Sequence, residues 1–196
     1  MSENTTNVLL CGVGGQGVLL ASEVLSAAAM LSGRDVKKSE VHGMAQRGGA
    51  VTSHVRWGKK VYSPLIEAGT ADVILSFEPG EALRWSHYLS PRGAVLTAKE
   101  PIYSVLVSSG VETYPEDVMD RLKERCARLV AVDALDEARA AGNPKAVNIL
   151  LLGMLSVFVD VPAENWEEAI RERVPPKTIE SNLRAFQRGR ELAGGK

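Results

Sequence analysis

A glycine-rich loop between an apolar run and a helical pattern constrains the fold of this chain more than any other feature. Residues 7–11 form a short apolar run, which is typical of a strand buried on both faces of a parallel sheet. The loop Gly12–Gly17 (GVGGQG) follows, and over residues 17–31 apolar and small residues recur at helical spacing as far as Gly33. Residues 36–41 can then form a second strand. The whole unit, about 35 residues, has the size of a right-handed strand–helix–strand crossover.

The rest of the chain keeps alternating between strand and helix patterns, with one exception. Residues 51–57 alternate in polarity with period two, which predicts a half-exposed strand, and Gly58-Lys59 is expected to turn it into an antiparallel edge hairpin with residues 60–62. Further strands are expected over 71–77, 94–98 and 128–133, with helices over 78–88 and from residue 115 to Cys126. Three helices are expected to end the chain: one from Pro144 with Asn143 as its cap, one over 163–173, and one after Pro175-Pro176.

One domain covers the whole chain in this interpretation. With 196 residues, no internal repeat and no linker, the chain has the ordinary size of one domain. The sequence therefore predicts a single α/β domain over residues 1–196, a Rossmann-like three-layer fold with a mostly parallel sheet, an antiparallel hairpin and C-terminal helices. A net charge of −1 lacks the positive field that general binding of nucleic acid or an anionic membrane needs.

Two cysteines, Cys11 and Cys126, limit the redox and metal chemistry that the chain can support by itself. Most iron–sulfur clusters need four cysteine ligands, so no cluster is expected, and Cys11 is expected to be a buried free thiol. None of the three histidines is at i, i+4 spacing from another, so no metal site is predicted. No signal-peptide pattern is visible, and the apolar stretch 147–159 is shorter than the about 20 residues of a membrane span. We therefore expect a cytoplasmic protein with a buried helix in that stretch.

The first loop fits the dinucleotide-binding fingerprint, since Gly12, Gly14 and Gly17 stand between a strand and a helix. Such glycines allow a tight turn and let a phosphate approach the free amides at the start of the helix. A dinucleotide site also needs an acidic residue after the second strand to bind the ribose hydroxyls, and Glu40 is the candidate. The alternative is that the glycines only let the loop pack tightly against a neighbouring segment or subunit.

A second loop, Glu40–Gly49 (EVHGMAQRGG), follows the carboxyl end of the predicted second strand, where open parallel sheets place their ligand crevices. It offers a carboxylate, an imidazole, an amide and a guanidinium on a glycine frame, and Arg47 can hold a phosphate or carboxylate through paired hydrogen bonds. The alternative is a solvated entry to the hairpin, with Arg47 in water. Neither loop contains a nucleophile paired with a base, so no catalytic residue is predicted in this chain.

These two loops, together with residues 142–148 (GNPKAVN), resemble the gamma-type domain of the 2-oxoacid:ferredoxin oxidoreductase family. The resemblance extends over nearly the whole chain, and the second loop is its most specific part. Within the family, the chain is similar to the small subunit of enzymes that oxidise indolepyruvate. Further segments that support the resemblance are SPLI at 63–66, FEP at 77–79, PPK at 175–177, Asn182 and Ala185-Phe186.

The resemblance implies a subunit of a thiamine-dependent enzyme that oxidatively decarboxylates a 2-oxoacid, expected to be indolepyruvate or another aryl pyruvate. The products it implies are an acyl-coenzyme A and reduced ferredoxin, with coenzyme A as co-substrate. It also implies a larger partner, the alpha subunit, which carries thiamine diphosphate and iron–sulfur clusters. This chain is then inactive alone, and a homodimer is an alternative state of the isolated chain. The sequence agrees, because it has no Gly-Asp-Gly thiamine motif and no cluster-forming set of cysteines.

The resemblance further implies which residues help to close the active site, or the coenzyme A channel, at the subunit interface. They are the motif positions of the two loops: Gly12, Gly14, Gly15, Gln16, Gly17, Glu40, His42, Gly43, Met44, Gln46, Arg47, Gly48 and Gly49. Two other functions stay open from the residues alone. One is an independent nicotinamide-dependent dehydrogenase, and the other is a non-catalytic assembly subunit.

Overall fold

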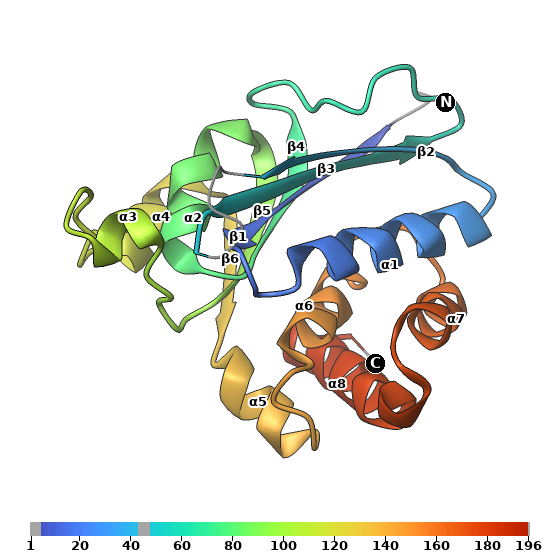
Figure 1. Ribbon diagram of the computed structural model, residues 1–196. Coiled ribbons are helices and arrows are strands. Elements are labelled where there is room, and N and C mark those ends of the chain that lie inside the picture. The colour runs from blue at the N-terminus through green and yellow to red at the C-terminus, as the bar shows by residue number, and fades with distance from the viewer. Residues whose placement is uncertain (1–4, 43–47, 196) are drawn as a thin grey trace.

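A six-stranded sheet forms the middle layer of the structure (Figure 1). The computed structural model describes residues 5–42 and 48–195 of the chain. Its strands are β1 (Thr6–Val13), β2 (Asp35–His42), β3 (Ala50–Gly58), β4 (Ala71–Ser76), β5 (Leu89–Ala98) and β6 (Arg128–Val132). They lie in the order β2-β3-β1-β4-β5-β6. The pairs β1–β4, β4–β5 and β5–β6 are parallel, whereas β3 is antiparallel to both β1 and β2.

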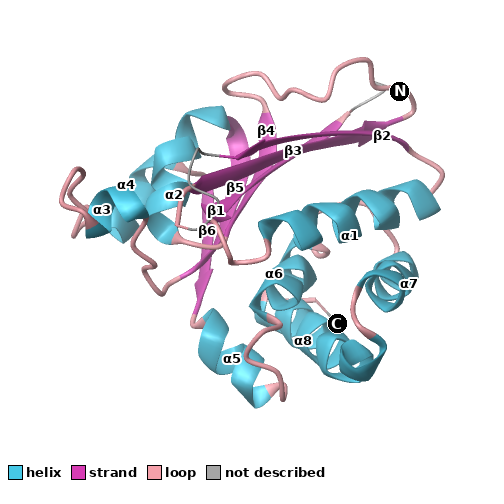
Figure 2. Cartoon of the chain, in the orientation of Figure 1, coloured by secondary structure: helices cyan, strands magenta, loops and turns pink. Residues whose placement is uncertain are grey.

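Helices cover both faces of this sheet (Figure 2). Their bounds are α1 (Val18–Leu31), α2 (Pro79–Trp85), α3 (Val105–Ser108), α4 (Val118–Arg125), α5 (Ala134–Ala140), α6 (Val147–Leu155), α7 (Ala163–Arg173) and α8 (Ile179–Leu192), with short 3-10 helices at Ser86–Tyr88 and Pro176–Thr178. Helices α1 and α5 to α8 lie on one face, and α2 and α4 lie on the other. The predicted three-layer α/β fold with a mostly parallel sheet is confirmed.

The side chains of β1 show how one buried strand builds two cores. Successive residues of a strand point to opposite faces of the sheet. Val8 and Leu10 therefore pack in the core beneath α1, α6, α7 and α8, while Leu9 and Cys11 pack in a second core beneath α2 and α4. All four side chains are fully buried. The first loop thus begins from a strand that is held on both of its faces.

The antiparallel hairpin differs from the predicted one. Residues 60–62 form no strand, and the hairpin partner of β3 is β2. β3 lies inside the sheet between β2 and β1, and its polar face, with Thr52 and His54, is buried rather than half-exposed. The segment after β3 covers that face, since the amide of Ile66 donates to Nδ1 of His54 at 3.1 Å. Alternation identified the strand but carried no information about the loop that covers it.

The C-terminal helices follow the prediction in part. The stretch 147–159 contains α6, which is buried almost throughout, and no helix in the described ranges is long and apolar enough to cross a membrane. α7 and α8 match the second and third predicted helices. The first begins at Val147 rather than Pro144, since Asn143 instead forms a turn in which its Oδ1 accepts the amide of Lys145 at 3.0 Å. α5 was not predicted, because a seven-residue helix leaves too short a periodic pattern.

α6 and α8 cross at two glycines. A Cβ on Gly153 would overlap the carbonyl oxygen of Phe186, and a Cβ on Gly189 would overlap that of Leu150. The two backbones can approach this closely only because neither position carries a side chain. The crossing holds the start of α6, including Asn148, in place beside the first loop.

Candidate functional site

The carboxyl ends of β1, β4 and β5 meet at one edge of the sheet. β1 leads into α1 on one face, and its neighbour β4 leads into α2 on the other, so the chain leaves the sheet in opposite directions here (Figure 1). In open α/β sheets such a switch point is the usual ligand crevice. The candidate edge therefore consists of the first loop, residues 77–79 after β4 and residues 99–101 after β5.

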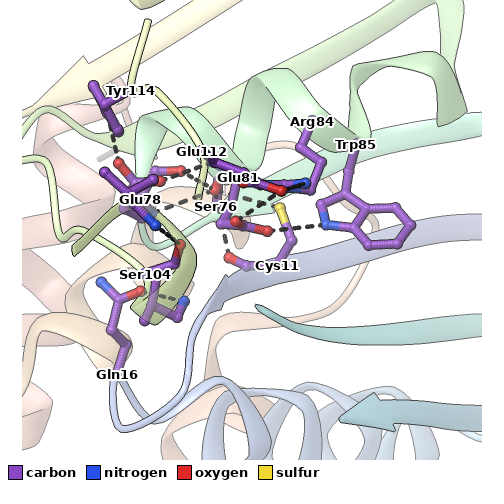
Figure 3. A network of polar contacts seen from close by, with 12 residues as sticks. Cys11, Gln16, Ser76, Glu78, Glu81, Arg84, Trp85, Ser104, Glu112 and Tyr114 are labelled. Atoms are coloured by element: carbon purple, nitrogen blue, oxygen red, sulfur yellow. Dashed lines mark hydrogen bonds and ion pairs between the residues drawn. The ribbon is translucent and has the colours of Figure 1, made fainter. Parts of the chain in front are cut away.

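The side chain of Gln16 joins the first loop to the end of β4 (Figure 3). Its Oε1 accepts the amide of Val13 at 2.7 Å, and its Nε2 donates to the carbonyl oxygen of Phe77 at 2.7 Å. Both polar ends of the side-chain amide are thus used within the chain. Gln16 bridges the switch point, the place where a doubly wound fold usually binds its ligand.

Gly12 and Gly17 are required by the close packing of the first loop. A Cβ on Gly12 would lie 2.9 Å from Oε1 of Gln16. Gly17 has a φ of +83°, and a Cβ there would lie 2.6 Å from Nδ2 of Asn148. Gly15, with a φ of +103°, is exposed and has nothing within 4 Å of its Cβ position. Packing within the chain therefore accounts for Gly12 and Gly17, whereas Gly15 faces outward.

The end of the second loop lies against the first loop. The amide of Gly14 donates to the carbonyl oxygen of Gly49 at 2.8 Å, and the amide of Gly48 donates to that of Gly14 at 3.4 Å. Gly48 also accepts the amide of Val105, the first residue of α3, at 2.8 Å. The two loops and α3 therefore form one continuous edge. Of the other predicted positions, His42 ends β2, and Gly43, Met44, Gln46 and Arg47 lie outside the described residues.

Glu40 lies on β2, away from the first loop. β3 separates β2 from β1, and Glu40 pairs in register with Ser53 of β3. Its carboxylate accepts the hydroxyl of Ser22 in α1 at 3.0 Å and pairs with Nζ of Lys38 at 2.7 Å. A ribose-binding acid must reach a nucleotide beside the first loop, whereas this carboxylate connects β2 to α1. The geometry does not favour a nicotinamide-dependent dehydrogenase.

A buried carboxylate, Glu78, follows β4 (Figure 3) and is not one of the site residues predicted from the sequence. Glu78 is 2% exposed. Its Oε1 accepts the hydroxyl of Tyr114 at 2.6 Å, and its Oε2 accepts the amide of Glu81 at 2.8 Å, which caps α2. Burial and the contact with Glu78 raise the pKa of the Tyr114 hydroxyl. The available signal was Phe77-Glu78-Pro79, a capping residue and a proline directly after a buried strand.

A second buried carboxylate, Glu81, lies one turn further along α2. Its Oε1 accepts Nε–H of Arg84 at 3.2 Å, and its Oε2 accepts the indole N–H of Trp85 at 3.2 Å. Burial raises the pKa of Glu81, although Arg84 and Trp85 act in the opposite direction. Arg84 also pairs with Glu112, with 2.5 Å between Nη2 and Oε2, and so connects α2 to the segment before α4.

The described part of the chain does not form a metal site. No group of three His, Cys, Asp or Glu side chains there is placed to hold a metal ion. Cys11 donates its S–H to Oγ of Ser76 at 3.3 Å, and burial raises the pKa of its thiol. Cys126 is a partly buried free thiol. These residues do not fit an iron–sulfur cluster, which needs several thiolates in one place.

A cavity of about 620 Å³ opens beside the first loop. Its wall is mostly apolar and includes Gly15, Ile102 and Lys145. Glu100, also in the wall, accepts the amide of Leu135 at 3.0 Å and so caps α5. Lys145 forms no ion pair with any other described residue. Among the described residues of its wall, the cavity therefore combines an apolar interior with the available cation Lys145.

Known proteins are similar to this chain over almost its whole length. The family described as Pyruvate ferredoxin/flavodoxin oxidoreductase matches residues 7–192. The indolepyruvate oxidoreductase subunit IorB of Thermococcus kodakarensis is 46% identical over 192 residues, which cover 95% of each chain. The solved gamma subunit of a keto/oxoacid ferredoxin oxidoreductase from Geobacter sulfurreducens is 25% identical, with a TM-score of 0.72 and coverage of 96% of this chain and 98% of that one. The 2-oxoglutarate:ferredoxin oxidoreductase from Magnetococcus marinus, 18% identical with a TM-score of 0.76, shares the fold over 98% of this chain but only 32% of its own.

Proposed function

Because this chain belongs to the pyruvate ferredoxin/flavodoxin oxidoreductase family and is the small subunit of a 2-oxoacid:ferredoxin oxidoreductase, we propose that its complete enzyme oxidises indolepyruvate. The observation that carries this proposal is the 46% identity, over 95% of both chains, with an indolepyruvate oxidoreductase subunit. Indolepyruvate is an aryl pyruvate, and other aryl pyruvates are the expected secondary substrates.

In the proposed reaction, the bond between the carboxyl and keto carbons of the 2-oxoacid breaks and carbon dioxide leaves. The acyl group is joined to coenzyme A, and the electrons pass to ferredoxin. Thiamine diphosphate supplies the carbanion stabilisation that this cleavage needs, and iron–sulfur clusters conduct the electrons. We place both in the larger alpha subunit, because this chain has no Gly-Asp-Gly thiamine motif and its two cysteines are too few for a cluster.

A larger partner is consistent with the size of related proteins. In the Magnetococcus marinus enzyme, the same fold occupies 32% of one longer chain, so the fold can be covalently attached to other parts of such an enzyme.

The proposal includes a cytoplasmic location, which suits the free thiols Cys11 and Cys126, because the cytosol keeps thiols reduced.

The role we assign to this chain is to close the active site, or the coenzyme A channel, of the larger subunit. The hydrogen bond between Gly14 and Gly49 supports this role, since it builds one edge from two separate loops. Gln16 and Gly17 hold the shape of that edge, and Gly15 exposes backbone that a partner or ligand can approach closely.

The test compares the larger subunit alone, the small chain alone and the two chains together. Reduction of an electron acceptor is followed with indolepyruvate, thiamine diphosphate and coenzyme A. We expect turnover only in the two-chain enzyme, with kcat/KM for indolepyruvate at least about tenfold above that for pyruvate or 2-oxoglutarate. Turnover by the small chain alone, or unchanged turnover of the larger subunit without it, would disprove the subunit role. A preference for another oxoacid would disprove the substrate only.

A purely structural assembly subunit is the second candidate, and Arg47 distinguishes it from a subunit that contacts coenzyme A. Arg47→Ala in the two-chain enzyme is expected to raise KM for coenzyme A about tenfold, because one charge-assisted pair with a phosphate is lost. Arg92→Ala, at an exposed arginine near the amino end of β5, is the matched control. If Arg47→Ala and Arg92→Ala both leave KM unchanged, the assembly role is favoured.

A further inference from the structure

Five exposed apolar side chains lie in one short segment at the candidate edge. Residues 101–111, the apolar segment, contain no charged residue in a chain with 24% charged residues. The segment's exposed side chains, which are between 45% and 72% accessible, are Ile102, Tyr103, Val105, Leu106 and Val111. Contiguous exposed apolar surface on a folded chain marks an interaction site.

The fold holds the apolar segment in a defined position. At its C-terminal side, the hydroxyl of Tyr114 donates to Glu78 at 2.6 Å, and Glu112 pairs with Arg84 of α2 (Figure 3). Within the segment, Oγ of Ser104 accepts the amide of Val107 at 3.3 Å and caps α3. The apolar side chains are therefore presented by an anchored backbone, which reduces the entropy that a partner must remove on binding.

The apolar segment continues the edge made by the glycine loops. Val105 donates its amide to Gly48, and a Cβ on Gly48 would lie 2.6 Å from Cγ2 of Val105, so the two segments are in direct contact. On the other side, Ile102 lines the cavity of about 620 Å³ that Gly15 and Lys145 also line. Among the described residues, this surface thus combines the apolar segment, an apolar cavity and the cation Lys145.

We propose that the apolar segment is the docking surface for the larger subunit of the enzyme. The inference rests on the proposed function and names the contact by which the candidate edge meets its partner. The chemistry of this surface defines what the partner must present. The partner needs an uncharged apolar surface against the apolar segment, an aromatic or branched side chain that enters the cavity, and a carboxylate that faces Lys145. An apolar centre with a polar rim is the usual anatomy of stable interfaces.

A second copy of this chain fits the surface less well, because the two acidic residues that directly flank the apolar segment, Glu100 and Glu112, already have partners. Glu100 caps α5, and Glu112 pairs with Arg84, so neither carboxylate is available to face Lys145 of a second copy. The larger subunit can supply the missing carboxylate. Charge complementarity therefore favours the larger subunit over self-association.

The experiment measures the affinity of the small chain for the larger subunit in the two-chain enzyme. The variants are Leu106→Glu and Val111→Glu, which place a charge on the apolar segment. The control is Tyr62→Glu, at an 89% exposed residue in the loop between β3 and β4, at the opposite edge of the sheet. We expect the dissociation constant to rise at least about tenfold for both variants, because a buried unpaired charge opposes docking, and to stay within about twofold for the control.

Each outcome decides the proposal. An unchanged dissociation constant in either variant overturns the proposal. An equal loss of affinity for the larger subunit in Tyr62→Glu overturns it as well. Val111 is 72% exposed, so Val111→Glu decides the matter if Leu106→Glu lowers the melting temperature of the chain. If Leu106→Glu abolishes a homodimer but leaves binding to the larger subunit intact, the occupant is a second copy and the proposal is wrong. The proposed function fails separately, when the wild-type chain itself does not restore turnover to the larger subunit.

Discussion

The hydroxyl of Tyr114 donates a 2.6 Å hydrogen bond to Oε1 of Glu78 and so joins the segment before α4 to the carboxyl end of β4. Glu78 is 2% exposed, so its carboxylate depends on donors from the protein rather than on water. The carbonyl oxygen of the preceding residue, Phe77, accepts a hydrogen bond from the side-chain Nε2 of Gln16. The end of β4 therefore positions both the first loop and the apolar segment.

Tyr114→Phe is expected to destabilise the chain by removing this donor. A hydrogen bond to a charged group contributes about 1.5–3 kcal/mol, and we expect the free energy of unfolding to fall by about that amount. Urea unfolding followed by circular dichroism measures the change. Tyr103→Phe is the matched control, because Tyr103 is exposed and its edge contact with the Tyr114 ring survives the substitution. Equal losses in the two variants would contradict the role of the Glu78 contact.

The raised pKa of Glu81 predicts a specific dependence of stability on pH. Burial raises the folded-state pKa of Glu81 above the ordinary value of 4.5, so the folded chain binds this proton more tightly than the unfolded chain does. Glu81 therefore destabilises the fold increasingly as pH rises from the unfolded pKa through the folded pKa, and by a constant amount above it. Glu81→Gln removes this titration while keeping an oxygen that can accept the indole N–H of Trp85.

Denaturant unfolding at a series of pH values compares this variant with the wild type. We expect the stability of Glu81→Gln relative to the wild type to rise over the pH range just above 4.5 and then to level off. A relative stability that is the same at every pH would show that the carboxylate titrates alike in the folded and unfolded chains.

Gln16→Glu tests the bridge across the switch point. The new carboxylate can still accept the amide of Val13, but it has no N–H for the carbonyl oxygen of Phe77, so two oxygens face each other. We expect a loss of about 1–3 kcal/mol in the free energy of unfolding and a lower kcat/KM of the two-chain enzyme. Gln187→Glu, at an exposed position of α8, makes the same chemical change as a control. A stable, fully active Gln16→Glu enzyme would rule out the bridge as a support of the edge.

The strand, loop and helix at the start of the chain were predictable because their signals are local. A buried apolar run, a glycine loop and a helical period follow one another, and Gly33, with a φ of +72°, ends the helix as expected. The position of β3 was not predictable in this way. Its pairing with both β1 and β2 depends on residues far apart in the chain, and a period-two pattern does not identify the strand's neighbours.

The candidate site was predictable in the same limited sense. Gln16 could be assigned to a functional loop, but its hydrogen-bond partner Phe77 lies 61 residues away, so no local sequence pattern indicates the contact. Glu78 and Tyr114 are separated by 36 residues, so no local sequence pattern connects them. Glu40 was expected near the first loop because a second strand usually lies beside the first, and the insertion of β3 between them removes that proximity.

Gly17→Ala is expected to cost more than the same change at a glycine of matching backbone conformation. Gly17 and Gly69 have φ angles of +83° and +78°, so alanine strains both by about 1–2 kcal/mol. Only at Gly17 does the new Cβ meet another group, Nδ2 of Asn148 at 2.6 Å, whereas nothing lies within 4 Å at Gly69. The free energy of unfolding should therefore fall by about 1–3 kcal/mol more for Gly17→Ala than for Gly69→Ala. Adding Asn148→Ala to Gly17→Ala removes the clashing atom and should recover part of that difference. Equal losses of unfolding free energy at the two glycines would show that contact with α6 does not constrain the loop.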